Sequence, residues 1–189
     1  MSRPAPIRRH RFTTEAYFRM AEVGILAEDD RFELLEGEIV EVSPPGNRHA
    51  AVLSRLNSLF VPAAARRAIV RVQDPLNLGD FSAPQPDIAL VRYVEDFHES
   101  AHPSADDVFL VIEVADNSVR MDMGRKARIY AAAGVREYWV VDLVHERIVV
   151  HKEPGRQEYA SVRSLTRREV VFTGALPGKE WTVDAILGI

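Results

Sequence analysis

The chain of 189 residues contains no cysteine, and this absence removes several kinds of chemistry. Disulfides, thiolate zinc sites, iron–sulfur clusters and cysteine nucleophiles all need a thiol. Any catalysis must therefore use oxygen and nitrogen groups. No run of about 18 apolar residues occurs, and the arginine-rich segment 1–11 is not followed by the apolar stretch of a signal peptide. We therefore expect a cytoplasmic protein with no membrane partner.

Signature motifs of three common enzyme classes are also missing. The sequence has no Gly-x-Ser-x-Gly, no Gly-x-Gly-x-x-Gly and no phosphate-binding loop that ends in Gly-Lys-Ser/Thr. Serine hydrolases, dinucleotide-binding proteins and nucleoside triphosphatases are thereby excluded. The 28 acidic residues outnumber 24 Lys and Arg, which gives a net charge of −4. This balance argues against a surface coated with positive charge for tight, non-specific nucleic-acid binding, although a local basic groove is compatible with it.

The length and the 47% hydrophobic content are typical of one globular domain, and no repeat or Gly/Ser-rich linker divides the chain. We expect a single domain over 1–189. Within it, the patterns predict an N-terminal arm over 1–12, a core over 31–143, and a C-terminal hairpin and tail over 144–189.

The spacing of apolar residues predicts an α/β fold. Helices are predicted over three segments: Thr13 or Thr14 to Glu22, Asn47 (as the cap) to about Arg67, and Arg120 to Ala133. Strands are predicted where apolar residues alternate or run together: 32–35, 39–42, 69–72, 87–91, 108–114, 137–142, 147–151 and 159–162. The strand, helix and strand within 108–142 form a βαβ unit with parallel strands. The expected fold is a mixed β-sheet flanked by helices, with hairpins toward both termini.

One enzyme motif matches literally, within a polar segment before residue 108. His98-Glu99-Ser100-Ala101-His102 is H-E-x-x-H, which in zinc metalloproteases places two imidazoles on one face of a helix beside a general base. Pro103 disfavours helical geometry at His102, and the flanking residues lack apolar periodicity. We interpret the segment as a charged surface loop. A zinc peptidase using His98 and His102 is the third functional alternative.

Glu113 is the most informative residue, because it lies inside the apolar strand predicted at 108–114. Burying a carboxylate costs several kcal/mol unless it is paired, protonated or bound to a cation. Asp87 opens a candidate neighbouring strand, so the two side chains can converge at one end of the sheet. A divalent cation such as Mg²⁺ would hold their oxygens together. The alternative is a buried ion pair between Glu113 and an Arg or Lys, with an exposed Asp87.

Lys126 is the third candidate group. Helical spacing places it on one face with Asp122, Ile129, Tyr130 and Ala133. One interpretation is an exposed Asp122–Lys126 pair at i, i+4, worth only a few tenths of a kcal/mol. In the other, the ammonium reaches over the edge of the sheet toward the water on the metal. The three groups then form a metal-assisted hydrolytic site.

An ordered set of residues between 32 and 142 resembles a known family. The set comprises Phe32-Glu33-Leu34-Leu35-Glu36-Gly37-Glu38, His49, Pro86-Asp87, Glu113-Val114-Ala115, Ser118, Asp122, Lys126 and the run from Tyr130 to Asp142. In this set the chain resembles the Uma-type endonucleases of the PD-(D/E)XK superfamily, which have a restriction endonuclease-like fold. The resemblance implies a core of a helix and three strands followed by a helix and a strand. It also implies that Asp87 and Glu113 are metal ligands.

One position departs from the superfamily pattern, whose Glu-x-Lys would place a lysine at Ala115. The resemblance implies that this lysine has moved to the following helix, as Lys126. If Lys126 does not reach the carboxylates, we expect a non-cleaving relative. His49 is an accessory candidate as a ligand or as a residue that orients the water, against the alternative of a helix-start histidine without a catalytic task. Glu33 is a second one, but strand alternation leaves open whether it points inward.

We therefore expect a metal-dependent phosphodiesterase, a DNA endonuclease that uses Mg²⁺ or Mn²⁺ held by Asp87 and Glu113. The ion would lower the pKa of a bound water and stabilise charge on the phosphoryl oxygens. Lys126 would orient or deprotonate that water, or offset the developing charge. The rival interpretation is a non-catalytic nucleic-acid-binding or assembly protein that keeps the fold.

Two further expectations concern partners. Arg120, Arg125 and Arg128 belong to the predicted helix of Lys126, which makes them candidates for contacts to phosphates beside a scissile bond. The closing hairpin and the apolar tail 181–189 are candidates to cover a partner. The family resemblance favours a homodimer.

Overall fold

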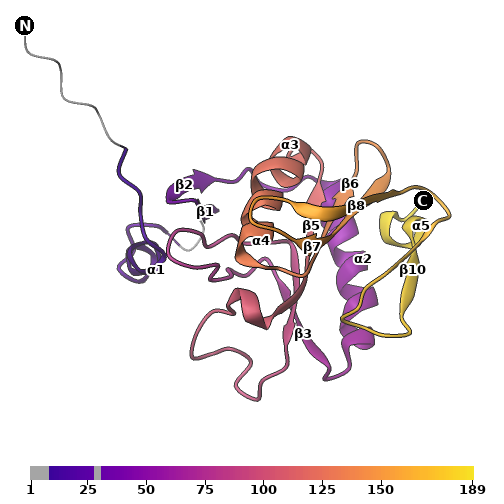
Figure 1. The fold of residues 1–189 in the computed structure, drawn as a ribbon, viewed down its shortest axis with the longest axis horizontal. Helices are drawn as coiled ribbons and strands as arrows, with labels where there is room; N and C mark the ends of the chain where they lie inside the picture. The colour runs from indigo at the N-terminus through magenta and orange to yellow at the C-terminus, as the bar shows by residue number, and fades with distance from the viewer. Residues whose placement is uncertain (1–8, 28–30) are drawn as a thin grey trace, which may run out of the picture.

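The computed structural model describes residues 9–27 and 31–189, and its central feature is a six-stranded mixed sheet (Figure 1). Its strands, in spatial order, are β3 (Ala68–Val72), β4 (Ile88–Arg92), β5 (Val108–Ala115), β6 (Glu137–Asp142), β7 (Arg147–Pro154) and β8 (Tyr159–Leu165). β5 and β6 pair in parallel, as the βαβ unit predicts, and the other neighbours pair antiparallel. Residues 1–8 of the predicted arm lie outside the described residues.

Helices cover both faces of this sheet, with α2 on one side and the α3–α4 segment on the other (Figure 1). The helical elements are α1 (Thr14–Glu22), α2 (Asn47–Ala64), the 3₁₀ turn η1 (Ala105–Asp107), α3 (Val119–Met121), the π-helical turn η2 (Asp122–Lys126), α4 (Ala127–Ala133) and α5 (Val183–Leu187). Within the described ranges, no helix is both long and apolar enough to cross a bilayer.

Strand β5 is buried on both faces, as its apolar sequence predicts. Ile112 packs in the core on the α2 side, whereas Val111 packs in the core beneath α4. Glu113 has the parity of Val111, so its side chain points to the α4 face. Ala89 of β4 also packs on that face, and Asp87 shares its parity. Strand alternation therefore directs both carboxylates toward the face on which η2 lies.

A hairpin of β1 (Phe32–Leu35) and β2 (Glu38–Glu41) forms a separate small sheet, as predicted. Its turn consists of Glu36 and Gly37, which have φ angles of 52° and 86°. A Cβ on Gly37 would lie 2.7 Å from the Cβ of Arg11. Glycine is therefore required both for its positive φ and for this close approach.

Two predicted helices differ from the observed ones in detail. Gly46, not Asn47, is the N-cap of α2, and the helix ends at Ala64 because Ala65 adopts a left-handed conformation. The helix predicted over 120–133 contains the π-helical turn η2. Such turns are frequent at functional sites, and they re-aim the side chains around them.

The C-terminal segment packs on the molecule itself. β7 and β8, the predicted closing hairpin, extend the main sheet, and β9 (Val170–Phe172) and β10 (Glu180–Thr182) form a second small sheet. Trp181 stacks on Phe60 of α2 with ring centroids 4.3 Å apart, and Ile186 is buried in the same core. These two tail side chains therefore pack in the core beside α2, and a partner that covers the hairpin and tail stays a prediction.

Candidate active site

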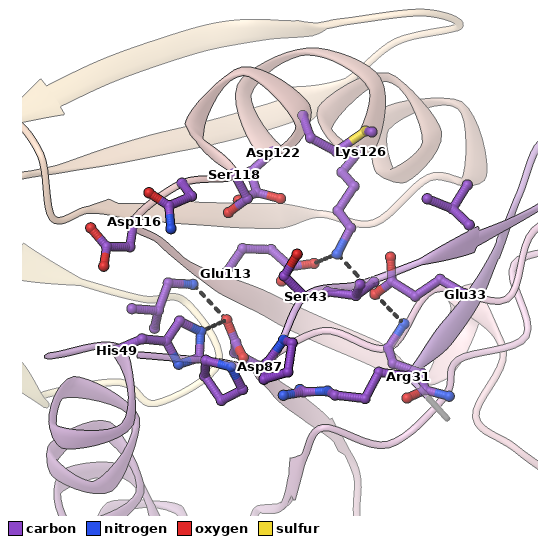
Figure 2. Close-up of a pocket in the computed structure, with 18 of the residues that line it drawn as sticks. Arg31, Glu33, Ser43, His49, Asp87, Glu113, Asp116, Ser118, Asp122 and Lys126 are labelled. Atoms are coloured by element: carbon purple, nitrogen blue, oxygen red, sulfur yellow. Dashed lines mark hydrogen bonds and ion pairs between the residues drawn. The ribbon is translucent and has the colours of Figure 1, made fainter. Parts of the chain in front are cut away.

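One pocket, with a cavity volume of about 260 Å³, brings together the predicted site residues (Figure 2). It is lined by Glu33 of β1, His49 of α2, Asp87 just before β4, Glu113 of β5 and Lys126 of η2. Each side chain thus comes from a different part of the chain. The segments 42–46 and 116–118 form further parts of the wall.

The ammonium of Lys126 joins two of the carboxylates. Its Nζ donates hydrogen bonds of 2.9 Å to Oε1 of Glu33 and of 2.9 Å to Oε1 of Glu113. The three side chains are only 8%, 4% and 5% exposed. Tyr130, one turn later, donates to the same Glu113 oxygen at 2.8 Å. Because an ammonium carries three N–H groups, one remains for an oxygen of a ligand or water.

Burial and charge act in opposite directions on Lys126. Burial alone would lower the pKa of its amine, but the carboxylates of Glu113, Glu33 and Asp122 outweigh that effect and raise the pKa above its ordinary value. The group is therefore an ammonium at neutral pH. The interpretation of an exposed Asp122–Lys126 surface pair is wrong, because the two residues are 2% and 6% exposed.

Asp87 is fixed by three hydrogen-bonding groups. Its Oδ2 accepts from the backbone N–H of Val114 at 2.8 Å and lies 3.0 Å from Nε2 of His49, and its Oδ1 accepts from Nε2 of Gln73 at 3.0 Å. Burial raises the pKa of Asp87, but the hydrogen bonds and the charge of His49 outweigh it, so the pKa lies below its ordinary value. A carboxylate has about four lone-pair positions, so one is left for a cation or water. The alternative of an exposed Asp87 is wrong, since the residue is 7% exposed.

Asp122 adds a further acid to the pocket wall. Its carboxylate accepts a hydrogen bond from the hydroxyl of Ser118. Burial raises the pKa of Asp122 to about 6, against the opposing effects of Lys126 and Ser118. Asp122 therefore titrates close to neutral pH.

Glu113 also binds its proton more tightly than an exposed glutamate does. Burial raises its pKa well above the ordinary value, Lys126 opposes this, and the carboxylates of Asp122, Asp87 and Glu33 raise it further. The pocket therefore holds more buried acid than its one lysine neutralises. The alternative of a buried Glu113–Lys pair is present in the structure, but it leaves this excess of negative charge.

The oxygen atoms of the pocket are compatible with a hard divalent cation. Across residues 9–27 and 31–189, no group of three or more His, Cys, Asp or Glu side chains is arranged to hold a metal ion. Mg²⁺, however, keeps several waters and uses only one or two carboxylates, and Asp87 and Glu113 supply two. Oε2 of Glu33 is buried without a hydrogen-bond partner in the described part of the chain, so it also lacks a donor or cation. The donor chemistry of Asp87 and Glu113 therefore fits a hard cation such as Mg²⁺ or Mn²⁺.

The family follows from a model that covers most of the chain. The model described as "Uma2: Putative restriction endonuclease" matches residues 14–184. The chain belongs to the Uma2 family. A crystal structure described as "a putative nuclease belonging to DUF820 from Anabaena variabilis" matches it with a TM-score of 0.72 at 15% sequence identity, covering 94% of this chain and 98% of that one. This likeness confirms the predicted nuclease-like α/β fold. A comparison with curated proteins found no match to this chain.

In this Uma2 chain the lysine reaches the carboxylates from outside the strand. Ala115 occupies the position at which the superfamily pattern would place it, and Lys126 of η2 comes within 2.9 Å of Glu113 instead. Lys126 therefore reaches the carboxylates, so a lysine out of reach is no reason to expect a non-cleaving relative. Glu33, whose direction the sequence left open, points inward and is 3% exposed.

The three arginines predicted to contact phosphates do not line this pocket. Arg125 forms ion pairs of 2.9 Å with Glu36 and of 2.9 Å with Glu38, so it fastens the β1–β2 hairpin to η2. Arg128 lines a separate cavity, and Arg120 is exposed. Their contact with phosphates stays a prediction.

The H-E-x-x-H segment of this Uma2 chain is a loop, as predicted. Phe97 and His98 have left-handed φ angles of 52° and 61°. Nε2 of His98 lies 3.0 Å from the carbonyl oxygen of Arg92, whereas the ring of His102 stacks on Phe18 of α1 at 4.5 Å. The two imidazoles therefore do not share a helix face. The zinc-peptidase alternative loses its structural basis.

Some pocket residues carry little signal in the sequence. Gln73 contacts Asp87 because it follows β3, which pairs antiparallel with β4, and no motif marks it. Tyr130 shares a predicted helix face with Lys126, so the sequence does indicate that the two side chains lie close together. Arg31 lines the pocket two residues before Glu33, so the period of a strand would have placed both on one face.

Proposed function

We propose that this protein hydrolyses phosphodiester bonds of DNA with a divalent cation held by Asp87 and Glu113. The observation that carries the proposal is the convergence of these two carboxylates with the ammonium of Lys126 in one pocket (Figure 2). Membership of the family described as "Putative restriction endonuclease" supports nucleic acid as the substrate class. A homodimer remains a prediction.

The bound ion would supply an acidified water and positive charge beside the phosphoryl oxygens. Asp87 suits this role because its pKa lies below the ordinary value, so it is a carboxylate at neutral pH. His49, Val114 and Gln73 fix its orientation through hydrogen bonds. The orientation of Asp87 is thus set before an ion would bind, which limits the reorganisation needed during the reaction.

Lys126 would act as a hydrogen-bond donor and not as a proton acceptor. Its raised pKa keeps it protonated at neutral pH, so it cannot deprotonate a water without first losing a proton. Its third N–H would instead orient the attacking water or offset negative charge on a phosphoryl oxygen. Of the roles considered from the sequence, the contacts support these two over that of a general base.

Cleavage assays with plasmid and single-stranded DNA test the proposal. We expect the wild type to cleave in Mg²⁺ or Mn²⁺ and not in EDTA, and we expect Asp87→Ala and Lys126→Ala to reduce the rate by a factor on the order of 10² or more. His98→Ala, in the remote loop, is the matched control and should retain the wild-type rate. Circular dichroism verifies that each variant is folded. Equal rates for the wild type and both site variants would refute the proposal, and DNA binding without any cleavage would favour the non-catalytic rival.

A further inference from the structure

Arg31 is a further cationic side chain in the wall of the pocket. It is half-buried and lines the pocket, yet it forms no side-chain hydrogen bond or ion pair with any residue in the ranges 9–27 and 31–189. Two other arginines close to the pocket are engaged: Arg125 pairs with Glu36, and Arg48 with Glu146. In the part of the chain that the structure describes, Arg31 therefore offers an unpaired guanidinium beside the proposed catalytic groups.

The main chain holds Arg31 in this position. Its carbonyl oxygen accepts a hydrogen bond of 2.7 Å from the backbone N–H of Val42, which ties it to the end of the β1–β2 hairpin. Glu33, two residues later, is fixed by the backbone N–H of Gln85 at 3.0 Å and by Lys126. The carbonyl group of Arg31 and the side chain of Glu33 are thus anchored, whereas the guanidinium has no partner among the described residues.

The position of Arg31 complements that of the other groups. In Figure 2 its side chain lies at the lower side of the labelled group, beside Asp87, whereas Lys126 and Asp122 lie at the upper side and Glu113 lies between. A phosphodiester held near the two carboxylates would have Lys126 on one side and Arg31 on the other. A nucleic-acid strand carries a phosphate on each nucleotide, so a second phosphate follows the scissile one.

We propose that Arg31 binds a phosphate next to the scissile one on the strand that enters the pocket. The guanidinium fork matches phosphate oxygens in a bidentate arrangement, and it stays charged at any physiological pH. Such a contact positions the strand and does not read its sequence. The inference rests on the proposed function for the identity of the strand, but the anion contact can be measured without cleavage.

Binding of a fluorescently labelled single-stranded oligonucleotide tests this role. A single strand is the suitable probe for a cavity of about 260 Å³. The titration uses Ca²⁺ in place of Mg²⁺, and a gel verifies that the oligonucleotide stays intact. We expect Arg31→Ala to weaken binding on the order of tenfold or more, because a charge-assisted contact is lost. The slope of log affinity against log salt should become shallower by about 0.7, the value for one phosphate on a single strand.

Two variants sharpen the interpretation. Arg31→Lys keeps the charge and should retain the salt slope, but it should recover only part of the affinity because the fork is lost. Arg66→Ala removes an exposed arginine that pairs with Glu95, away from the pocket, and should bind like the wild type. Circular dichroism verifies that Arg31→Ala is folded, so that a loss of binding reports the missing guanidinium.

The inference and the proposed function fail in different ways. If Arg31→Ala matches the wild type in affinity and salt slope, or if the wild type does not bind the oligonucleotide, the phosphate contact is overturned even where cleavage in Mg²⁺ is intact. If Arg31→Ala lowers the affinity and the salt slope while neither the wild type nor any variant cleaves DNA, the phosphate contact stands and the proposed hydrolysis fails.

Discussion

Lys126→Met should lower the free energy of unfolding by about 3–5 kcal/mol and abolish divalent-dependent cleavage. Methionine keeps the length of the side chain but removes the ammonium that donates to Glu33 and Glu113 at 2.9 Å. Both carboxylates would then be buried without their cation, which is more costly than the loss of the attraction itself. Urea unfolding at pH 8 in EDTA measures the stability, and initial rates in Mg²⁺ measure the activity.

Lys152→Met is the matched control for Lys126→Met. Lys152 also pairs with a buried acid, Glu137, at 3.2 Å, but its side chain is 35% exposed and the acid has further donors in Trp139 and Thr173. We expect this change to cost only about 1 kcal/mol and to leave the cleavage rate unchanged. A Lys126→Met protein as stable as the Lys152→Met protein would contradict the view that the pocket depends on its ammonium.

Glu113→Gln should separate activity from stability. We expect the cleavage rate to fall by a factor on the order of 10² to 10³, because a proposed metal ligand loses its charge. The fold should nevertheless be as stable as the wild type, or more stable, at pH 8. The amide oxygen of glutamine can still accept hydrogen bonds from Lys126 and Tyr130. The substitution also removes one of several negative charges that repel one another in the pocket.

The difference in stability between Glu113→Gln and the wild type should change with pH in a defined direction. Burial raises the pKa of Glu113 above its ordinary value, so the folded state binds this proton more tightly than the unfolded state does. That contribution is complete below the ordinary pKa and is lost as the pH rises toward the folded-state value. The stability of Glu113→Gln minus that of the wild type should therefore grow from pH 5 to pH 8 in EDTA. The exposed Glu158→Gln serves as control and should show neither effect, and a difference that shrinks with pH would contradict the assignment.

The fold could be predicted largely because its signals are local. The apolar run around Glu113 predicted a strand buried on both faces, and the spacing of strand, helix and strand predicted the parallel pair β5–β6. The hairpin turn at Glu36 and Gly37 followed from residue chemistry alone. The π-helical turn η2 could not be predicted, because its five residues have the spacing of an ordinary helix.

Glu113, Asp87 and Lys126, which were singled out in the sequence, do line one pocket, but most of their contacts could not be predicted. An isolated acid in an apolar strand pointed to Glu113, strand position and helical spacing suggested Asp87 and Lys126, and the family resemblance then implied roles for all three. The bond from Lys126 to Glu33, however, joins residues 93 positions apart, and it depends on how the hairpin packs against η2. The donor from Gln85 to Glu33 is a backbone group, which leaves no trace in the sequence. Contacts of this kind depend on tertiary packing, so the sequence alone does not predict them.

A crystal structure of the wild type grown with Mn²⁺ tests the central claim most directly, because anomalous scattering locates the ion. We predict one Mn²⁺ bonded to carboxylate oxygens of both Asp87 and Glu113, with Nζ of Lys126 still within hydrogen-bonding distance of Glu113. Saturating Mn²⁺ that leaves both carboxylates without an ion, or that binds only outside this pocket, would contradict a metal-dependent phosphodiesterase centre at this site.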